Sequence, residues 1–464
     1  SILLEAGLDL TRHKSFNASI HVESHRTGSR TLHVVSDVYP TGGHSRVLTK
    51  WIQRDLGSSH GIVLTRQAAP VPDFLAKIWA DRKTIIKALN PGDSVAIRAR
   101  QLKAISSNFD RVILHHHPDD AVPLVAFAKS NGCPVAMFNH AHFWFCLGSS
   151  TSDMIINTMS YFQNLTIRHR FPKKTALLKG PLGLEPLGRE EVDKKSAKKH
   201  LGLPENQPVA MTIAQESYFK PMDGYDFFKT AEKLLDRLPD IHLVVVGVST
   251  ESHLVPETLK RNARLHLAGP VANPKPYYQA ADICLESFPM SSLGAFVESV
   301  AYGEAFPVPV YGPGENVLRT SMDMIAKHLV RAKNEDEYLG QLCEQVQSLD
   351  SIREKAREMR RLIIAEDEAF GDQFNSLYQR IDGLQHTAVK IPETGCCRGD
   401  DNYLLASFTD PDIGRELDRL LPFTPAIIGN IQAGLRGYQS KRLCFGRVRQ
   451  RCLRSFRKFM MRPF

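Results

Sequence analysis

The sequence lacks any uninterrupted run of eighteen or more apolar residues. A membrane-spanning helix needs about twenty, so no such helix is expected. Residues 1–30 lack the basic-then-apolar pattern of a secretory signal, and the chain begins with Ser1. The eight cysteines are scattered apart from Cys396 and Cys397, with no CxxC pair and no zinc spacing. We therefore expect reduced thiols, no disulfide framework and a cytoplasmic protein.

Acidic residues are absent from residues 431–464, which carry ten Lys and Arg. The whole chain has a net charge of +9, so the remainder is close to neutral. A protein that binds nucleic acid with its body would carry the basic residues there. We therefore expect no nucleic-acid partner.

Short apolar runs alternate with helical patterns along most of the chain. Strands are expected at Leu32–Val38, Arg111–Leu114 and Pro134–Phe138, and a second series begins at Val209–Ala214. Such alternation predicts an α/β protein whose parallel sheets are covered on both faces. In tandem units of this type, ligands bind in the cleft at the carboxyl ends of the strands.

Four segments follow from this pattern. They are an N-terminal extension (1–30), a first doubly wound domain (31–183), a second doubly wound domain (184–370) and a helical extension with a basic tail (371–464).

The most informative segment runs from Glu286 to Gly303, where a strand gives way to a helix. The small residues of Ser291–Gly294 let a ligand approach the backbone, and the free N–H groups of a helix start favour an anion. Glu298 lies about two turns into that helix, where a carboxylate can accept hydrogen bonds from both hydroxyls of a ribose. The plainer interpretation is an ordinary turn followed by a solvated Glu.

This segment resembles the donor-binding signature of GT-B glycosyltransferases, which include the large retaining family 4 and an acidic-x-Phe-Pro variant found in O-GlcNAc-transferase-like enzymes. Glu286–Pro289 matches the opening, Ser291–Gly294 matches the pyrophosphate loop, and Glu298 matches the ribose-binding Glu. Met290 stands where family 4 has the first Glu of its pair. The resemblance implies a GT-B fold, in which two Rossmann-like domains face each other across a cleft. It also implies sugar transfer from a nucleotide diphosphate sugar, with a UDP-sugar favoured.

Two segments of the first domain extend the resemblance. Thr41–Arg46 matches a glycine-rich loop near the donor phosphates and the acceptor, and glycine there permits close backbone approach. Asn139–Trp144 is similar to a His-rich strand end of related bacterial enzymes, which implies that its histidines point into the cleft. Taken alone, the first is a plain turn and the second is a structural histidine.

Lys220 follows the first strand of the second domain, where the family has a Lys that neutralises the diphosphate. Gln215 is the nearest polar residue to the Arg that usually precedes it. A lone Lys is otherwise a solvated surface charge. The implied donor site comprises Gly42, Gly43, Gln215, Lys220, Ser291, Ser292, Leu293, Gly294 and Glu298.

The expected chemistry assigns roles to a few of these groups. The diphosphate gains negative charge as it leaves, and Lys220 and the helix start are suited to stabilise it. The acceptor hydroxyl loses its proton to the departing phosphate in a retaining route. In an inverting route a base accepts it, and His142 or His44 is the candidate. Both routes remain open.

The run His115–His117, followed by Asp119 and Asp120, resembles a metal site only superficially. Adjacent histidines on a strand point in different directions, and two adjacent carboxylates do not form a DxD motif. The resemblance also implies a metal-free enzyme. We expect no metal and no cofactor beyond the donor, with one or two of these rings lining the cleft and the others packing.

Apolar residues recur at three- and four-residue steps in the tail, with basic residues between them. This pattern predicts a basic amphipathic helix that either lies on an anionic membrane or packs on protein. A membrane-bound tail would suit a glycan, lipid-linked or protein acceptor in bacterial surface polysaccharide synthesis. Two other functions remain: a nucleotide-sugar epimerase on the same fold, and a non-catalytic glycan or nucleotide binder.

Overall fold

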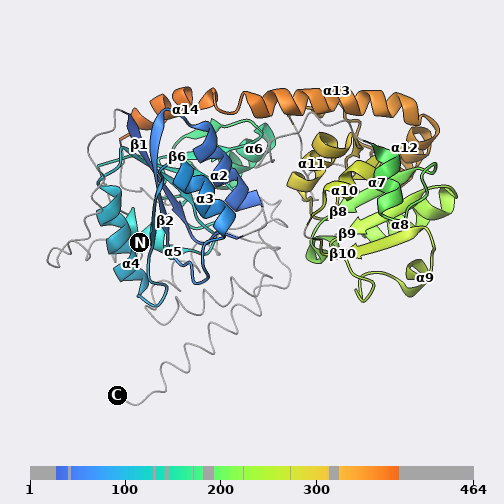
Figure 1. Ribbon diagram of the computed structural model, residues 1–464, viewed down its shortest axis with the longest axis horizontal. Coiled ribbons are helices and arrows are strands. Elements are labelled where there is room, and N and C mark those ends of the chain that lie inside the picture. The colour runs from blue at the N-terminus through green and yellow to red at the C-terminus, as the bar shows by residue number, and fades with distance from the viewer. Residues whose placement is uncertain are drawn as a thin grey trace, which may run out of the picture.

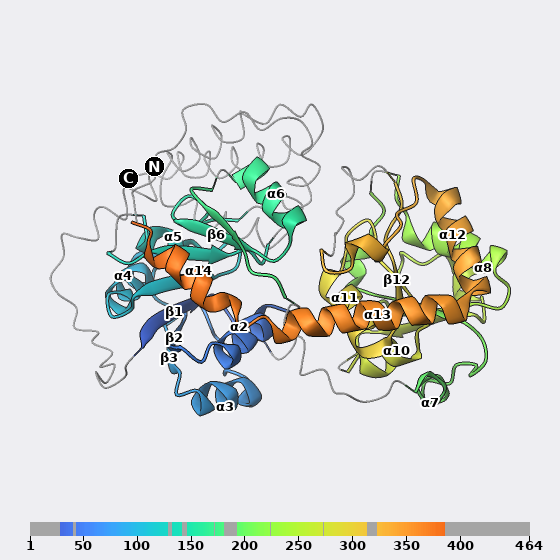
Figure 2. The same cartoon turned by 90° about the horizontal axis from the view of Figure 1, so that it is seen from above.

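The structure is a computed structural model, and it describes most of the chain between residues 28 and 385. The described ranges are 28–39, 43–128, 132–141, 146–170, 172–180, 193–222, 224–271, 273–312 and 323–385. Gly42, His142 and the basic tail at 431–464 lie outside them. The described residues form two α/β domains side by side, with helix α13 (Leu349–Glu368) running from the second domain toward the first (Figures 1 and 2).

The first domain is built on one parallel sheet of seven strands. Its strands are β1 (Ser29–Val35), β2 (Ser58–Leu64), β3 (Ile85–Ala88), β4 (Arg111–His115), β5 (Val135–Phe138), β6 (Met154–Asn157) and β7 (Thr175–Leu177). They are ordered β3-β2-β1-β4-β5-β6-β7. The expected strands at β1, β4 and β5 are confirmed, whereas the sequence did not indicate β2, β3, β6 or β7.

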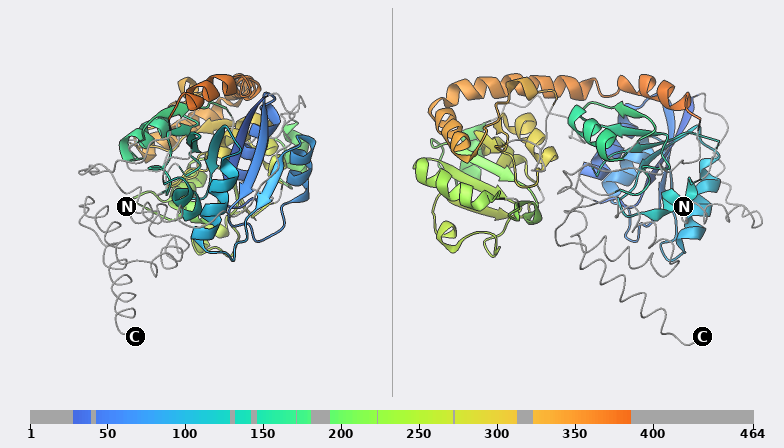
Figure 3. Two further views of the ribbon diagram at one scale, coloured as in Figure 1. Left: turned by 90° about the vertical axis from the view of Figure 1, so that its left-hand side faces the viewer. Right: turned by 180° about the vertical axis from the view of Figure 1, so that it is seen from behind.

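Five helices connect these strands in the described part of the first domain. They are α2 (Gly43–Arg54), α3 (Asp73–Asp81), α4 (Val95–Ser106), α5 (Ala121–Ala126) and α6 (Ser160–Arg170). Central strands such as β4 are buried along their whole length, because helices cover both faces of the sheet (Figure 3). Helix α2 turns its apolar side inward, so Trp51 and Ile52 are fully buried.

The second domain repeats the plan with a smaller parallel sheet. It contains β8 (Val209–Ile213), β9 (His242–Val246), β10 (Leu265–Gly269), β11 (Ile283–Leu285) and β12 (Phe306–Val308), ordered β10-β9-β8-β11-β12. Its helices are α7 (Lys194–His200), η1 (Glu216–Phe219), α8 (Phe227–Arg237), α9 (Glu257–Lys260), α10 (Lys275–Ala280), α11 (Leu293–Gly303), η2 (Ala326–His328) and α12 (Glu335–Gln347). The strand and helix series expected from Val209 onward is confirmed, and so is the α/β class with parallel sheets.

Helices α13 and α14 (Gln373–Asp382) bring the end of the described chain back to the first domain. Helix α13 packs on α11 and β12 of the second domain. Helix α14 instead joins an apolar cluster of the first domain, where Phe374 stacks on Trp51. The sequence indicated helices in this region but not this return.

Buried charges hold the returning helices in place. The Lys50 ammonium of α2 forms an ion pair with Asp367 of α13, and the two side chains are 8% and 5% exposed. Burial lowers the pKa of Lys50, and the Asp367 carboxylate opposes that shift. Arg111 of β4 donates two hydrogen bonds, at 2.8 and 2.6 Å, to the carboxylate of Asp382. Each buried charge depends on its partner, since an unpaired charge in this environment is costly.

No helix among the described residues is long and apolar enough to cross a membrane.

Replacing Asp367 with Ala should destabilise the fold, because it leaves the buried Lys50 ammonium without this carboxylate. The expected loss in the free energy of unfolding is about 3–5 kcal/mol, measured by urea denaturation. Asp336→Ala is the matched control, because Asp336 forms its ion pair with Arg237 at the surface. The control should lose no more than ~1 kcal/mol. Equal losses in the two variants would contradict the role given to the buried pair.

Candidate functional site

Residues 286–292 form the loop between β11 and α11. The Ser287 hydroxyl donates to Met290 O and accepts from Ser292 N, both at 2.9 Å. The fully buried Glu286 accepts a 2.9 Å hydrogen bond from Val310 N. Glu286 therefore joins the loop to the chain that follows β12, and its role is structural.

The first turn of α11 has the properties of an anion site. Its N-cap residue, Ser292, makes no side-chain hydrogen bond to the helix. A side chain added at Gly294 would meet no atom within 4 Å, so space adjoins the first turn. The first N–H groups of a helix lack intrahelical partners and lie at the positive end of its dipole. Phosphate oxygens can accept hydrogen bonds from these N–H groups, and their negative charge is favoured at the positive end of the dipole.

Gln215 and Lys220 flank the short helix η1, and Tyr218 of that helix contacts the α11 loop. Met290 N donates a 3.2 Å hydrogen bond to Tyr218 O, which ties the α11 loop to η1. Lys220 is the exposed residue that ends η1. Gly247, with φ +97°, lies so close to the backbone of Ala214 that a Cβ at this position would overlap the carbonyl oxygen of Ala214. The carboxyl ends of β8, β9 and β11 thus converge around the start of α11.

Glu298 is 8% exposed, and groups from both domains engage its carboxylate. Arg46 of α2 donates to Oε1 at 3.0 Å, which makes an ion pair between the domains. The Tyr278 hydroxyl of α10 donates to Oε2 at 2.9 Å. Burial and the nearby Glu298 carboxylate raise the pKa of Tyr278, so this hydroxyl keeps its proton. The sequence singled out Glu298 but not these two partners.

Tyr278 reaches Glu298 because α10 and α11 lie very close together. A Cβ at Gly303 would overlap the carbonyl oxygen of Tyr278. Tyr278 and Tyr302 also stack with ring centroids 6.2 Å apart. A glycine at position 303 is therefore needed for the close approach of α10.

His44 lies in the first turn of α2, directly after Gly43, on the first-domain side of the site. Its Nε2 donates to the carbonyl oxygen of His115, and its Nδ1 is buried with no partner in the part of the chain that the structure describes. Burial and the neighbouring His117 lower the pKa of His44 to about 3. The ring is therefore neutral at ordinary pH and a weak base.

Four further histidines form an unbroken series across the first sheet. Their ring nitrogens meet at 3.1 Å between His60 and His33, at 3.1 Å between His33 and His115, and at 3.0 Å between His115 and His140. Burial lowers the pKa of His33, His60 and His115. The sequence analysis identified only His115 and His140 of this series. His33 and His60 lie far from them along the chain, although their strands neighbour each other in the sheet.

The rest of the His115–Asp120 run packs within the protein. His116 Nε2 donates to Leu147 O at 2.7 Å. Asp120 accepts from Ser36 at 2.7 Å and also from Thr65, whereas Asp119 pairs with Arg66 at 2.8 Å. Within the described ranges, no three His, Cys, Asp or Glu side chains are placed to hold a metal ion.

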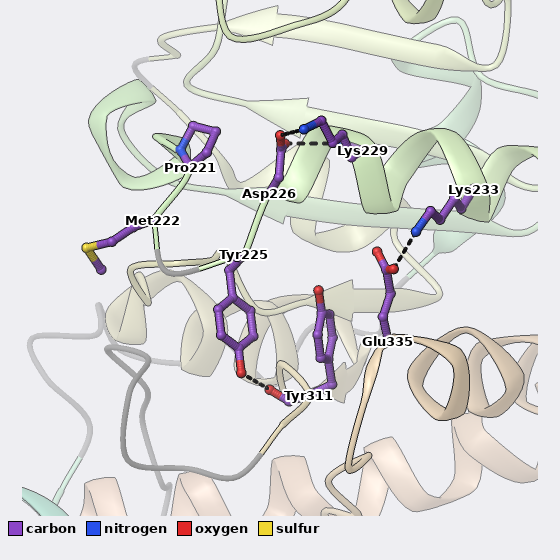
Figure 4. A pocket seen from close by; sticks show the side chains of 9 residues that line it. Pro221, Met222, Tyr225, Asp226, Lys229, Lys233, Tyr311 and Glu335 are labelled. Atoms are coloured by element: carbon purple, nitrogen blue, oxygen red, sulfur yellow. Dashed lines mark hydrogen bonds and ion pairs between the residues drawn. The ribbon is translucent and has the colours of Figure 1, made fainter.

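A pocket of about 320 Å³ lies on the second domain next to Lys220 (Figure 4). The segment after Lys220, the start of α8 and Tyr311 beyond β12 line it. Tyr225 donates to Tyr311 O at 3.4 Å, and Lys233 forms a 2.5 Å ion pair with Glu335. Its basic and acidic groups are balanced, and its tyrosine walls suit an uncharged polar ligand.

Known structures are similar to this chain in fold, at low sequence identity. No family model and no curated protein matches the sequence. A solved glycosyltransferase from Rickettsia africae has a TM-score of 0.59 at 13% identity and covers 77% of this chain and 100% of its own. A mutant O-GlcNAc transferase from Thermobaculum terrenum has a TM-score of 0.55 at 14% identity, with coverage of 76% and 68%.

HepE of Anabaena, solved in complex with UDP and glucose, has a TM-score of 0.55 at 10% identity and covers 75% of this chain and 99% of its own. These similarities confirm the expected GT-B fold with its two Rossmann-like domains. The chain therefore shares its fold with glycosyltransferases of known structure.

The low pKa values of His33, His44 and His115 predict that the free energy of unfolding decreases as the pH falls. These pKa values are lower in the folded protein than in the unfolded chain, so unfolding takes up protons as the pH falls through about 6.5. Each ring kept neutral should cost about 1 kcal/mol between pH 7.5 and 5.5. Urea denaturation at several pH values measures this. A His33→Gln variant should show a shallower decline, and a free energy of unfolding that is constant over this range would contradict the prediction.

Proposed function

We propose that the chain is a glycosyltransferase that moves a sugar from a nucleotide diphosphate sugar, with a UDP-sugar favoured, to a hydroxyl acceptor. The observation that carries the proposal is the start of α11, where the N-cap residue Ser292 makes no capping side-chain hydrogen bond and Glu298 is buried about two turns further along the helix. The similarity to HepE of Anabaena, which was solved with UDP and with UDP-glucose, supports the choice of donor.

The second domain would hold the donor. Its β-phosphate would accept from the first N–H groups of α11, with the Lys220 ammonium alongside, and both stabilise the charge that develops on the leaving diphosphate. The ribose hydroxyls would bind Glu298, sharing its oxygens with Arg46 and Tyr278. Gln215 would contact the donor from the end of β8.

The first domain would present the acceptor and remove its proton. The candidates at this face are His142 and His44, with Gly42 and Gly43 at the entrance to α2. The low pKa of His44 suits a ring that accepts a hydrogen bond more than one that stores a proton. A retaining route, in which the departing phosphate takes the proton, and an inverting route with a histidine base are both compatible with these positions.

Ligand-dependent unfolding tests the donor site. We expect UDP, and not GDP, ADP or CMP, to raise the melting temperature of the wild type, by an amount equivalent to ~2.7 kcal/mol at 100 times Kd. Glu298→Gln should weaken UDP about tenfold to a hundredfold, since a hydrogen bond to a charged group is worth roughly 1.5–3 kcal/mol. UDP-glucose should behave as UDP does.

Glu304→Gln is the matched control for that measurement. Glu304 lies at the other end of α11 and pairs with Arg360 at 2.9 Å, so this variant should keep the full response to UDP. A wild type that responds to no nucleotide would contradict the donor site. Release of free sugar from UDP-glucose with a changed configuration would favour an epimerase, and UDP binding without any turnover would favour a non-catalytic binder.

We place the acceptor on a glycan, lipid or protein of a bacterial surface polysaccharide pathway, with residues 431–464 binding the anionic membrane face. Each basic residue near such a surface contributes about 1 kcal/mol. The chain should therefore co-sediment with phosphatidylserine vesicles and not with phosphatidylcholine vesicles. A variant that ends at Asn430 should stay in the supernatant with both, and equal sedimentation of the two forms would contradict the proposal.

A further inference from the structure

The four-histidine series crosses one face of the first sheet from β2 to the end of β5. His60 is in register with Thr31, and His115 is in register with Val35. Thr31, His33 and Val35 alternate with their neighbours on β1, so they share one face, and residues in register share that face as well. Trp51 of α2 covers this face, with its ring 5.8 Å from His33 and 5.6 Å from His115.

The inner end of the series is a buried carboxylate. His60 Nε2 lies 3.3 Å from the carbonyl oxygen of Asp55 and 3.5 Å from its Oδ2. Tyr378 of α14 donates to the same Oδ2 at 2.5 Å and accepts from Trp51 Nε1 at 2.8 Å. Asp55 is only 4% exposed, so this end is closed to solvent.

The outer end lies at the edge of the sheet where the acceptor would bind. His140 follows β5 and is partly exposed. Its ring lies 4.2 Å from that of His44, in the first turn of α2. The same helix carries Arg46, which reaches Glu298 of the second domain. The series thus joins the cleft side of the first domain to a carboxylate deep within it.

The oxygens of Asp55 determine the direction of every hydrogen bond in the series. Both oxygens near His60 are acceptors, so His60 donates through Nε2 and accepts at Nδ1. A neutral imidazole has one donor and one acceptor nitrogen. His33 therefore donates through Nε2 to His60, His115 donates through Nε2 to His33, and His140 donates through Nε2 to His115. The lone pair of His140 is then on Nδ1.

We propose that Asp55, His60, His33 and His115 form a proton relay that holds His140 in its Nε2–H tautomer and carries inward a proton that His140 accepts from the acceptor hydroxyl. In this role His140 is the catalytic residue and the other four groups are positioning residues. The role in catalysis rests on the transferase activity proposed above, whereas the tautomer does not.

The transfer balances without a charged imidazole. As Nδ1 of His140 gains a proton, its Nε2 proton passes to Nδ1 of His115. His115 passes its own Nε2 proton to His33, and His33 passes one to His60. The Nε2 proton of His60 then moves to Oδ2 of Asp55. All four rings end neutral in the Nδ1–H tautomer, Asp55 ends as a carboxylic acid, and the reverse steps reset the relay.

Burial favours this outcome over an imidazolium. A low-dielectric interior penalises each charged ring, and the relay leaves all four rings neutral. Burial is the largest effect on the pKa of His60 and lowers it; the Asp55 carboxylate favours a positive charge on this ring, whereas Arg82 after α3 and Arg111 of β4 disfavour one. His44 and His116 disfavour a positive charge on His115. Asp55 and the hydroxyl of Tyr378 face the inner end.

Nitrogen-15 NMR of histidine-labelled protein tests the relay without any ligand. We expect His140 in the wild type to carry its proton on Nε2 and its lone pair on Nδ1. His33→Phe breaks the series two rings from His140 and should give a mixture of His140 tautomers. Asp55→Asn keeps the backbone oxygen that orients His60 and should leave the tautomer unchanged.

His266→Gln is the control, because it breaks the 2.9 Å contact between His242 and His266 in the other domain. It should leave the His140 signals as they are in the wild type. An Nδ1–H tautomer of His140 in the wild type would overturn the proposal, and this measurement needs no variant to fold. Unchanged His140 signals in a folded His33→Phe protein would overturn it as well.

Turnover of UDP-glucose with water as the acceptor tests the catalytic part. His33→Phe and Asp55→Asn should each lower kcat at least about tenfold, with KM for UDP-glucose within about twofold of the wild type. A kcat equal to that of His266→Gln would overturn the relay. If the wild type releases no UDP, the transferase proposal fails for this donor, and the tautomer measurement still decides whether the relay is present.

Discussion

The position of α14 on the first sheet is the constraint on which the two-domain arrangement depends. Helix α13 begins on the second domain, and near its far end Asp367 forms a buried ion pair with Lys50 of the first domain. Asp382 then binds Arg111, whose guanidinium also lies 4.0 Å from the Tyr378 ring. Both ion pairs include hydrogen bonds, which depend on direction as well as on charge. Helices α13 and α14 therefore hold the two domains in their relative positions.

The groups of the candidate site come from helices and from the segments that follow strands. On the second domain, a backbone hydrogen bond between Met290 and Tyr218 joins the loop before α11 to η1, the helix that Lys220 follows. On the first domain, α2 contributes His44 and Arg46 within a single turn. The scaffold thus places small numbers of charged and polar groups on rigid elements, and sequence changes in the loops between them can alter specificity without altering the fold.

The sequence predicted the repeating elements better than it predicted the contacts between them. Apolar runs such as Ile241–Val248 identify buried strands directly, and the strand β9 lies within that range. Short or polar strands such as β3, with three exposed residues, carry no such signal. Glu298 could be singled out from its place in a motif. Its partner Arg46 could not, because 252 residues separate them and only the packing of the domains brings them together.

The same limitation explains the histidines. His33 and His60 are isolated polar residues in apolar strands, and such residues are most often satisfied locally. Only the register of β1 with β2 and β4 shows that they are consecutive members of one series. The expectation that some rings of the His115–His117 run pack inside the protein is confirmed for His115 and His116, which are 0% and 4% exposed.

The ion pair between Arg46 and Glu298 has a thermodynamic consequence for how the domains move. A ligand that binds Oε1 of Glu298 in place of Arg46 removes this contact between the two domains. Occupancy of that carboxylate and the distance between the sheets are then linked equilibria, and the coupling free energy is the same whichever of the two changes first. Through Glu298, the binding of such a ligand is coupled to the contact between the two domains.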